Sequence, residues 1–346
     1  MTPGRERFPP GILLLLLGLS LAAAVFIRLS SPGPVAREAP LTEHRRTEPA
    51  LGTFATIVLI ADDSLAEEIY TCAGALLTTM DRELGFRGGG SLSALNASGA
   101  GSLQAAPGPD CLHPALIHLI ELSDTLCLLT GGTFDPSVGA LTDLWGWPSE
   151  PVLPDSRQVD SVLALTGWNR VVLTGDSIRL PEGMKLDFGA VAKGYTVDLL
   201  YRLAMSMGAS GALVEIGGEV RCGSTCDVDR TWRIAVRHPR EEGFWETIEL
   251  TEGAVATSGD YESFFVEDGV RYCHLLDPAT GWPSGRTVSV TVTADRCDVA
   301  DALATAVAVG GTGTAMMLPD SLYGYMIVLA EDAEGGITEW TTGSLR

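Results

Sequence analysis

The chain has 346 residues and a formal net charge of −21 at pH 7, with 46% apolar and 19% charged residues. The length allows one large domain or two ordinary ones, and the apolar content is sufficient for a large buried core. The acidic balance argues against a nucleic-acid partner, because a phosphate backbone would be repelled.

The N-terminal region predicts export. An uncharged stretch, "GILLLLLGLSLAAAVFI", occupies residues 11–27, with Arg5 and Arg7 before it and Arg28 after it. This pattern is typical of a signal peptide or an uncleaved membrane anchor, assigned here to residues 1–30. Because its length is near the lower limit for a spanning helix, both alternatives stay open. A linker is predicted at 31–50 and one folded domain at 51–340.

The cysteine content is odd, with seven residues in all. Cys222 and Cys226 are close enough in sequence to pair in a loop, and an oxidising compartment would allow it. Unpaired, partly buried thiols are an equally good interpretation. No C-x-x-C motif occurs, which argues against a zinc site or a thioredoxin-type site.

The predicted elements mix strands and helices without a regular βαβ repeat. Helices are predicted at 64–84, 112–130, 158–167, 191–208 and 298–309. Strands are predicted at 52–60, 169–174, 177–180 and 211–218, in "TWRIAVRHP", "WETIELTEGAVATSG", "VRYCHLLDP" and "TVSVTVTA", and last in "YGYMIVLAED". Many strands adjoin through short turns, which favours an α+β fold with largely antiparallel sheets over a doubly wound fold.

The stretch "KLDFGAVAKGYTVDLL", residues 185–200, runs from an apolar approach through glycines into a helical pattern. Asp187, Ala190 and Lys193 are predicted on the turn between a strand and a helix. Free backbone amides and the helix dipole favour an anion there, and Lys193 adds a positive charge. The alternative is an Asp cap followed by a solvated lysine.

A second candidate lies in "DRCDVADALATAVAVGG", residues 295–311. Asp301 and Thr305 are four residues apart, so both side chains face the same side of a helix. A carboxylate and a hydroxyl together suit a hard cation such as Mg²⁺. Alternatively, Asp298 caps the helix, Asp301 complements its dipole and Thr305 packs in the core.

Two further segments offer weaker signals. His274 ends an apolar strand, and a histidine there is either a general base or a satisfied structural residue. In "GGTFDPSVGALTDLWGW", residues 131–147, Phe134 and Asp135 follow two glycines and could bind a planar ring. The favoured alternative is a turn with Phe134, Trp145 and Trp147 in the core.

Together and in this order, these segments resemble the ApbE family of FAD:protein FMN transferases, which are exported bacterial enzymes. The matching stretches are "GTFATI", "GTFDPSVGALTDLWGW", "LDFGAVAKGYTVD", "LVEIGGEV", "VATSGDY", "HLLDPATGWP" and "DALATAVAVGG". They span roughly residues 51–330. The resemblance implies an α+β, T-fold-like architecture of largely antiparallel sheets with packed helices, preceded by an N-terminal signal or anchor helix.

The resemblance also implies roles for individual residues. It implies that His274 is catalytic and that Mg²⁺ is held by the Ala190 carbonyl, Asp301 and Thr305. Lys193 would help to hold the pyrophosphate of FAD, the substrate. The other implied FAD contacts are Leu51, Phe86, Thr133, Phe134, Asp135, Asp187 and Leu275.

The sequence departs from the family pattern in four ways. Leu51 stands where a flavin-contacting Met is usual, and Cys273 replaces one of two adjacent histidines. Phe86 lies in a loosely matching segment. No cysteine precedes Cys72, so the lipid-anchoring cysteine usual in the family is missing.

The function implied by the resemblance is Mg²⁺-dependent transfer of FMN from FAD to a threonine of an acceptor protein, with release of AMP. Alternatives are Mg²⁺-dependent hydrolysis of FAD to FMN and AMP, a flavin-binding protein without turnover, and a structural protein at a lipid surface. The implied acceptor is a subunit of a membrane redox complex. The enzyme would act on the extracytoplasmic face of the bacterial inner membrane, attached or directed there by its N-terminal segment.

Overall fold

The computed structural model describes residues 40–103 and 111–344. Its centre is an eight-stranded sheet in the order β1-β2-β6-β7-β10-β13-β14-β15, and every pairing in it is antiparallel. The strands are β1 (Thr42–Ala50), β2 (Thr53–Ala61), β6 (Gly211–Ile216), β7 (Glu219–Ser224), β10 (Gly253–Gly259), β13 (Ser289–Ala294), β14 (Tyr325–Glu331) and β15 (Ile337–Gly343). The expected α+β class with largely antiparallel sheet is confirmed.

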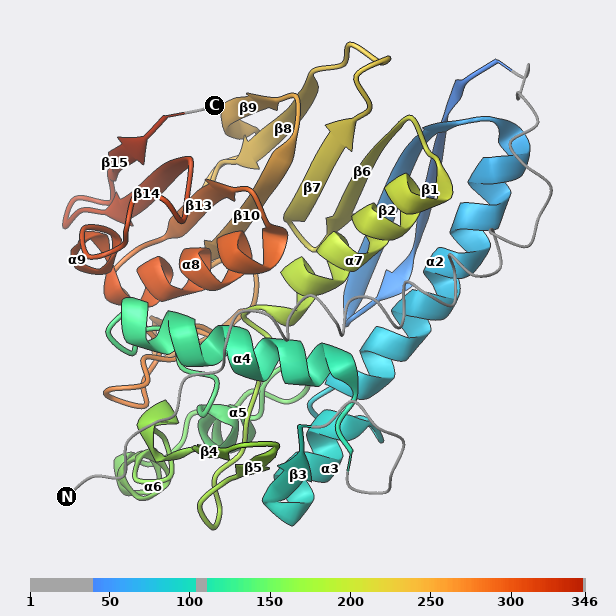
Figure 1. The fold of residues 1–346 in the computed structure, drawn as a ribbon. Helices are drawn as coiled ribbons and strands as arrows, with labels where there is room; N and C mark the ends of the chain where they lie inside the picture. The colour runs from blue at the N-terminus through green and yellow to red at the C-terminus, as the bar shows by residue number, and fades with distance from the viewer. Residues whose placement is uncertain (1–39, 104–110, 345–346) are drawn as a thin grey trace.

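Three helices cover one face of this sheet (Figure 1). They are α2 (Asp63–Leu84), α7 (Ala192–Met207) and α8 (Cys297–Gly310). The apolar face of α2 and α7 packs on β2 and β6 in a cluster that includes Ile57, Leu59, Val197 and Val214. Burial of these side chains provides the main stabilisation of this layer.

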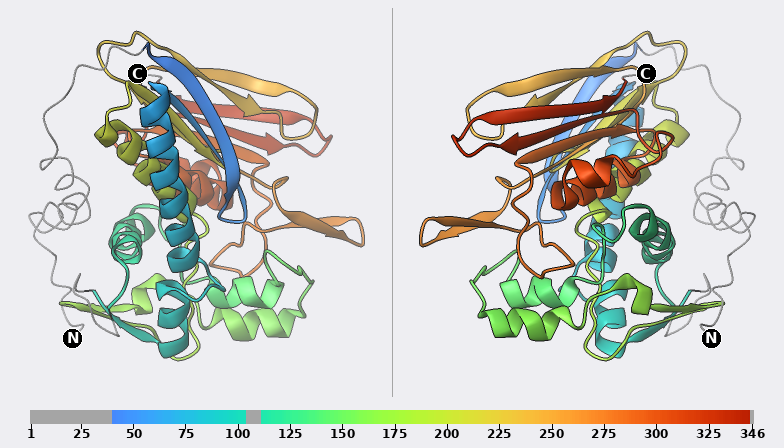
Figure 2. Two further views of the ribbon diagram at one scale, coloured as in Figure 1. Left: turned by 90° about the vertical axis from the view of Figure 1, so that its right-hand side faces the viewer. Right: turned by 90° about the vertical axis from the view of Figure 1, so that its left-hand side faces the viewer.

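The hairpin of β8 (Trp232–Arg237) and β9 (Phe244–Leu250) lies against the opposite face of the sheet. Trp232, Val236 and Ile248 pack there in one cluster with Val58 and Val220 of the sheet. A second hairpin, β11 (Phe264–Glu267) and β12 (Val270–Cys273), projects from the body between Ser263 and His274 (orange in Figure 2).

The remaining elements form a second layer below the sheet (Figures 1 and 2). The helices there are α3 (Ser91–Ser98), α4 (Pro114–Leu129), α5 (Gly139–Trp145), α6 (Ser156–Leu163) and the short 3₁₀ helix η1 (Trp168–Arg170). A small sheet in the order β3-β5-β4 comprises β3 (Ala100–Ser102), β5 (Ser177–Arg179) and β4 (Val172–Thr174). The short helix α9 (Thr312–Ala315) follows α8.

The N-terminal boundary differs from the prediction. Residues 42–50, expected in a linker, form the edge strand β1, which pairs with β2 along its whole length. The polar sequence "TEHRRTEPA" does not have the apolar pattern that predicts a strand, because an edge strand carries charged residues and proline on its exposed side. Strand β15 was also not predicted. The expected signal or anchor at 1–30 lies outside the described residues.

Two further findings concern membrane-spanning helices and the disulfide alternative. None of the helices within 40–103 and 111–344 has the length and apolar character needed to cross a membrane. Cys222 is buried, Cys226 is exposed, and the two do not form a disulfide, so the disulfide alternative is wrong.

Candidate active site

Two adjoining cavities lie where the first turn of α7 approaches α8 and the segment after β12. The smaller has a volume of about 130 Å³ and the larger about 1410 Å³. They share the lining residues Thr142, Asp187, Gly189, Lys193, Glu262 and His274. Because these residues border both spaces, the two form one continuous site.

The fold brings the predicted site residues together from distant segments. The smaller cavity is lined by Thr133, Phe134, Asp135, Asp187, Ala190, Lys193, His274, Leu275, Asp301 and Thr305. The other two, Leu51 and Phe86, line the larger cavity. The structure thus places all twelve residues around one site, while their individual roles stay predictions.

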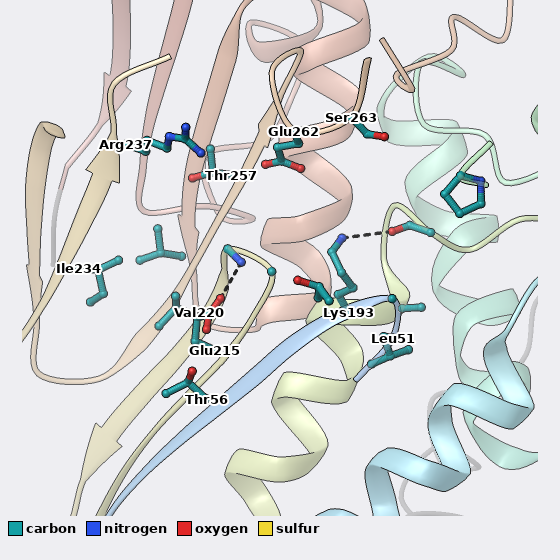
Figure 3. Close-up of a pocket in the computed structure, with 18 of the residues that line it drawn as sticks. Leu51, Thr56, Lys193, Glu215, Val220, Ile234, Arg237, Thr257, Glu262 and Ser263 are labelled. Carbon is teal, nitrogen blue, oxygen red and sulfur yellow. Dashed lines mark hydrogen bonds between the residues drawn. The ribbon is translucent and has the colours of Figure 1, made fainter. Parts of the chain in front are cut away.

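Lys193 lies beside buried carboxyl groups, and Figure 3 shows it in the pocket that Glu262 also lines. Its Nζ atom is 3.2 Å from Glu219 Oε1 and 4.0 Å from Asp301 Oδ1, and it donates a hydrogen bond to the Gly189 carbonyl at 3.4 Å. Burial acts to lower the pKa of Lys193, but the facing Asp301 and Glu219 outweigh it and raise the pKa above its usual value. Lys193 is therefore charged at neutral pH.

The carboxylates of this cluster outnumber its single ammonium group. Burial raises the pKa of Glu219 well above its usual range, although Lys193 acts to lower it. Burial likewise raises the pKa of Asp301, against the opposing effect of Lys193. Glu262, which faces the open cavity, has its pKa raised to about 7 by burial. Such an excess of carboxylate favours a bound cation.

Two carboxylate oxygen atoms of this cluster, Asp301 Oδ2 and Glu219 Oε2, are deeply buried. Asp301 Oδ2 accepts a hydrogen bond from the backbone N–H of Gly194 at 2.9 Å. Glu219 Oε2 has no hydrogen-bond partner among the described residues, although its side chain is only 2% exposed. A buried acceptor without a partner is costly, so this oxygen is available to a cation or a ligand donor.

The turn before α7 differs from the predicted one. No strand precedes it, since Lys185 makes only an isolated bridge with Val138. The carboxylate of Asp187 accepts hydrogen bonds from the Gly189 amide and from Thr142 Oγ1, each at 2.9 Å. The amides of Gly189 and Gly194 are thus already bonded to carboxylates, and the expectation of free amides fails at these two positions.

The loop at 133–135 is held rigidly by Asp135. Its Oδ1 accepts from the amide of Ser137 at 2.8 Å and from the Ser137 hydroxyl at 2.6 Å, and its Oδ2 accepts from the Trp168 amide at 2.9 Å. Phe134 is 2% exposed and belongs to the main core. The favoured alternative, a turn with aromatic residues in the core, is therefore confirmed for Phe134. Phe134 also lines the smaller cavity.

His274 follows β12 and faces both cavities. Burial, helped by the positive charge of Lys193, lowers the pKa of His274 to about 4. Its Nδ1 lies 3.2 Å from the carbonyl oxygen of Ser263. Because a carbonyl can only accept, Nδ1 carries the proton and Nε2 presents a lone pair. His274 is therefore a neutral imidazole with one basic nitrogen.

Helix α8 is held in register by a residue of α7. The buried carboxylate of Asp198 accepts from the amides of Cys297 and Asp298, each at 3.1 Å, and pairs with Arg221 Nη1 at 2.6 Å. Asp298 itself bonds His118 Nε2 at 2.9 Å, so it is not the predicted helix cap. These contacts fix the position of Asp301 one turn later.

The sequence analysis missed several lining residues, above all Glu219, Glu262 and Ser258. Ser258 Oγ lies 3.0 Å from Thr305 Oγ1. Glu219 directly follows Gly217 and Gly218, both at positive φ, which form the tight turn between β6 and β7. A carboxylate after such a turn in "LVEIGGEV" was the available signal.

The side chains that most often bind metal ions are not clustered in the described residues. Within the part of the chain that the structure describes, no three His, Cys, Asp or Glu side chains are grouped to hold a metal ion. The predicted set of Ala190 carbonyl, Asp301 and Thr305 contains only one such side chain, and all three residues line the smaller cavity.

Comparisons with known proteins show the family to which the chain belongs. The sequence model of the ApbE family matches residues 51–328. A Vibrio cholerae serotype O1 protein named FAD:protein FMN transferase is 31% identical over 322 residues, covering 89% of this chain and 93% of the relative. The chain belongs to the ApbE family and is an enzyme of that family.

Solved structures of the family have the same fold. The crystal structure of the ApbE protein from Thermotoga maritima superposes with a TM-score of 0.77 at 30% identity, covering 86% of this chain and 96% of that one. The flavin transferase ApbE from Vibrio cholerae gives a TM-score of 0.75 at 30% identity, covering 88% and 99%.

Proposed function

We propose that this enzyme transfers FMN from FAD to a threonine hydroxyl of an acceptor protein. The observation that carries the proposal is the convergence of His274, Lys193 and Asp301 on one cavity in a chain whose relatives are named FAD:protein FMN transferases. The larger cavity, with Leu51 and Phe86 on its wall, gives room for the rest of the dinucleotide. FAD would lie across both spaces with its pyrophosphate near Lys193.

The donor set fits a divalent cation. Asp301 and Thr305 supply a carboxylate and a hydroxyl, and Ala190 lies beside them in the smaller cavity. Hard oxygen ligands of this kind are those that Mg²⁺ prefers. Mg²⁺ held there would offset negative charge on the phosphate groups of FAD. The excess of carboxylates around Lys193 supports the same assignment.

His274 is placed to accept a proton. In the proposed reaction the threonine oxygen bonds to the phosphorus on the FMN side, while the bond from that phosphorus to the oxygen bridging the two phosphates breaks. The hydroxyl proton passes to Nε2 of His274, and AMP leaves with the bridging oxygen. Lys193, charged at neutral pH, stabilises the phosphate charge. The isoalloxazine ring is not altered.

We also propose an acceptor and a location. The N-terminal segment 11–27 supports export, with the enzyme directed or attached to the extracytoplasmic face of a bacterial inner membrane. An acceptor subunit of a membrane redox complex would then lie on the same side. The T-fold-like architecture, which the family resemblance implies, also stays a prediction.

The test is incubation of the folded domain with FAD, Mg²⁺ and candidate acceptor subunits, followed by mass spectrometry of each acceptor. A gain of one FMN phosphoester on a threonine is expected. Release of AMP and free FMN with no labelled acceptor would instead indicate a pyrophosphatase. FAD that stays intact would indicate a flavin-binding protein.

A further inference from the structure

The larger cavity extends well beyond the predicted FAD contacts. At about 1410 Å³ it exceeds the usual range for a small-molecule pocket, which is roughly 300–1,000 Å³. Its lining includes Leu51, which follows β1 beside the active site, and Arg45 and Glu43 of β1. Eight residue steps of extended chain separate Leu51 from Glu43, about 26 Å at ~3.3 Å per residue.

One wall of this extension is the strand β8. All six of its residues, Trp232–Arg237, line the cavity. Because side chains of a strand alternate between two faces, six consecutive lining residues mean that the edge of the strand borders the space. Among the described strands, β8 pairs only with β9, so the edge toward the cavity has no strand partner.

The floor of the groove is the sheet face. In Figure 3, Ile234 of β8 lies at one side of the pocket, Lys193 and Leu51 at the other, and Thr56 and Val220 between them. Apolar and small side chains on a floor beside a free strand edge are the features that bind an extended peptide by adding a strand. The groove leads directly to His274.

The charged groups at the far end of the groove are Glu43, which pairs with Arg230 at 2.8 Å, and Arg45. Arg45 of β1 lines the cavity, is exposed, and makes no ion pair with any residue in 40–103 or 111–344. A partner segment with a carboxylate near Arg45 would complement this charge.

We infer that the groove between β8 and the floor of β1, β2, β6 and β7 binds an extended segment of the acceptor protein as an added strand. The threonine of this segment reaches His274, and an acidic residue of the segment lies toward Arg45. This assignment rests on the proposed function. It predicts that the acceptor and FAD occupy different parts of one continuous cavity.

The first test uses the substitution Ala235→Tyr. Ala235 is exposed on β8, and tyrosine is a good strand former that would fill the groove without breaking the hairpin. Ala100→Tyr, on the edge strand β3 away from both cavities, is the matched control. Ala235→Tyr is expected to raise the KM for the labelled acceptor by about tenfold or more. The Kd for FAD stays as in the wild type.

The second measurement uses the wild-type chain, so it stands even if Ala235→Tyr fails to fold. Amide hydrogen exchange is followed after adding an acceptor whose target threonine is replaced by valine. Slower exchange in Trp232–Arg237, with no change in Ala100–Ser102, is expected because a bound strand protects the free edge. An Arg45→Gln variant should weaken the protection and reduce its sensitivity to salt.

The outcomes separate this inference from the proposed function. If the wild type labels an acceptor but neither KM nor β8 exchange changes, the groove assignment is wrong and the transferase assignment stands. If Ala235→Tyr weakens FAD binding as much as it weakens transfer, the groove belongs to FAD and the inference is overturned. If the wild type labels no acceptor, both fail.

Discussion

The backbone amide of Gly194 on α7 donates a hydrogen bond to Asp301 Oδ2 on α8 at 2.9 Å. The two helices can approach this closely only because residue 194 has no side chain. A Cβ atom there would lie 2.4 Å from the Cys297 carbonyl oxygen and 2.8 Å from Asp301 Cβ. This contact places the carboxylate of Asp301 beside Lys193, and thus sets the geometry of the proposed cation site.

Gly194→Ala should force α7 and α8 apart. We expect a loss of stability of about 1–3 kcal/mol, the usual range for overpacking, together with a large loss of transfer. Thermal unfolding and a transfer assay at a temperature where the variant is folded would measure both. Gly313→Ala on α9 is the control, because its added Cβ meets nothing within 4 Å. Equal effects of the two substitutions would contradict the close-packing account.

Asp301→Ala should abolish Mg²⁺-dependent transfer while the fold is retained. The substitution leaves the Gly194 amide without its acceptor, at a cost of about 1–3 kcal/mol, but it also removes one of the crowded carboxylates near Lys193. Transfer rates across a Mg²⁺ titration, with circular dichroism to check folding, test this. Near-normal turnover by the variant would refute the ligand assignment.

His274→Ala should slow transfer by about 10²–10⁴-fold, as expected for loss of a general base, without changing FAD affinity. Rates and FAD binding are measured on the same preparation. A parallel loss of both would identify His274 as a structural residue.

The pH dependence of transfer gives a separate test of His274. Burial lowers the pKa of His274 from 6.5 to about 4, so it stays neutral until the pH falls near that value. Any loss of rate assigned to its protonation should therefore appear far below pH 6.5. A rate that falls through pH 6.5 in the wild type but is flat in His274→Ala would contradict the lowered pKa.

Lys193→Met should destabilise the fold, on the order of 3 kcal/mol at pH 8, because Glu219 and Asp301 lose their compensating charge. Without the ammonium, the folded-state pKa values of these buried carboxyls rise further above their unfolded values. A raised carboxyl pKa gives stability that is present at low pH and lost as the pH rises through it.

The loss of unfolding free energy caused by Lys193→Met should therefore become smaller as the pH is lowered from 8 to 5. Urea unfolding at several pH values measures it. The double variant with Glu219→Gln should recover part of the loss, since one buried charge is gone. A deficit that does not depend on pH would show that Lys193 contributes through packing alone.

Much of the fold and the site could be predicted from local patterns. The helix predicted at 298–309 occupies Cys297–Gly310, and the apolar alternation at 52–60 gives β2, because both have strong periodicity. Strand β1 was missed because most of its residues are polar and it contains Pro49, as suits an edge strand. Local sequence patterns do not predict which polar residues contact one another in the folded chain.

The environment of Lys193 illustrates that limit. Asp301 was a candidate from its helix spacing, but Glu219 gave only a turn signal, and its contact with Lys193 depends on the packing of α7 beside β7. Asp135 was predicted to face the nucleotide, yet three hydrogen bonds within its own loop and to Trp168 engage its carboxylate. Such competition between local bonding and ligand binding is decided by tertiary structure.

The most direct measurement of the central claim is the molar ratio of AMP released to FMN attached to acceptor, followed over time with FAD and Mg²⁺. The account predicts one AMP per attached FMN, with both products vanishing together in Asp301→Ala. Abundant AMP with little attached FMN, at saturating acceptor, would contradict it.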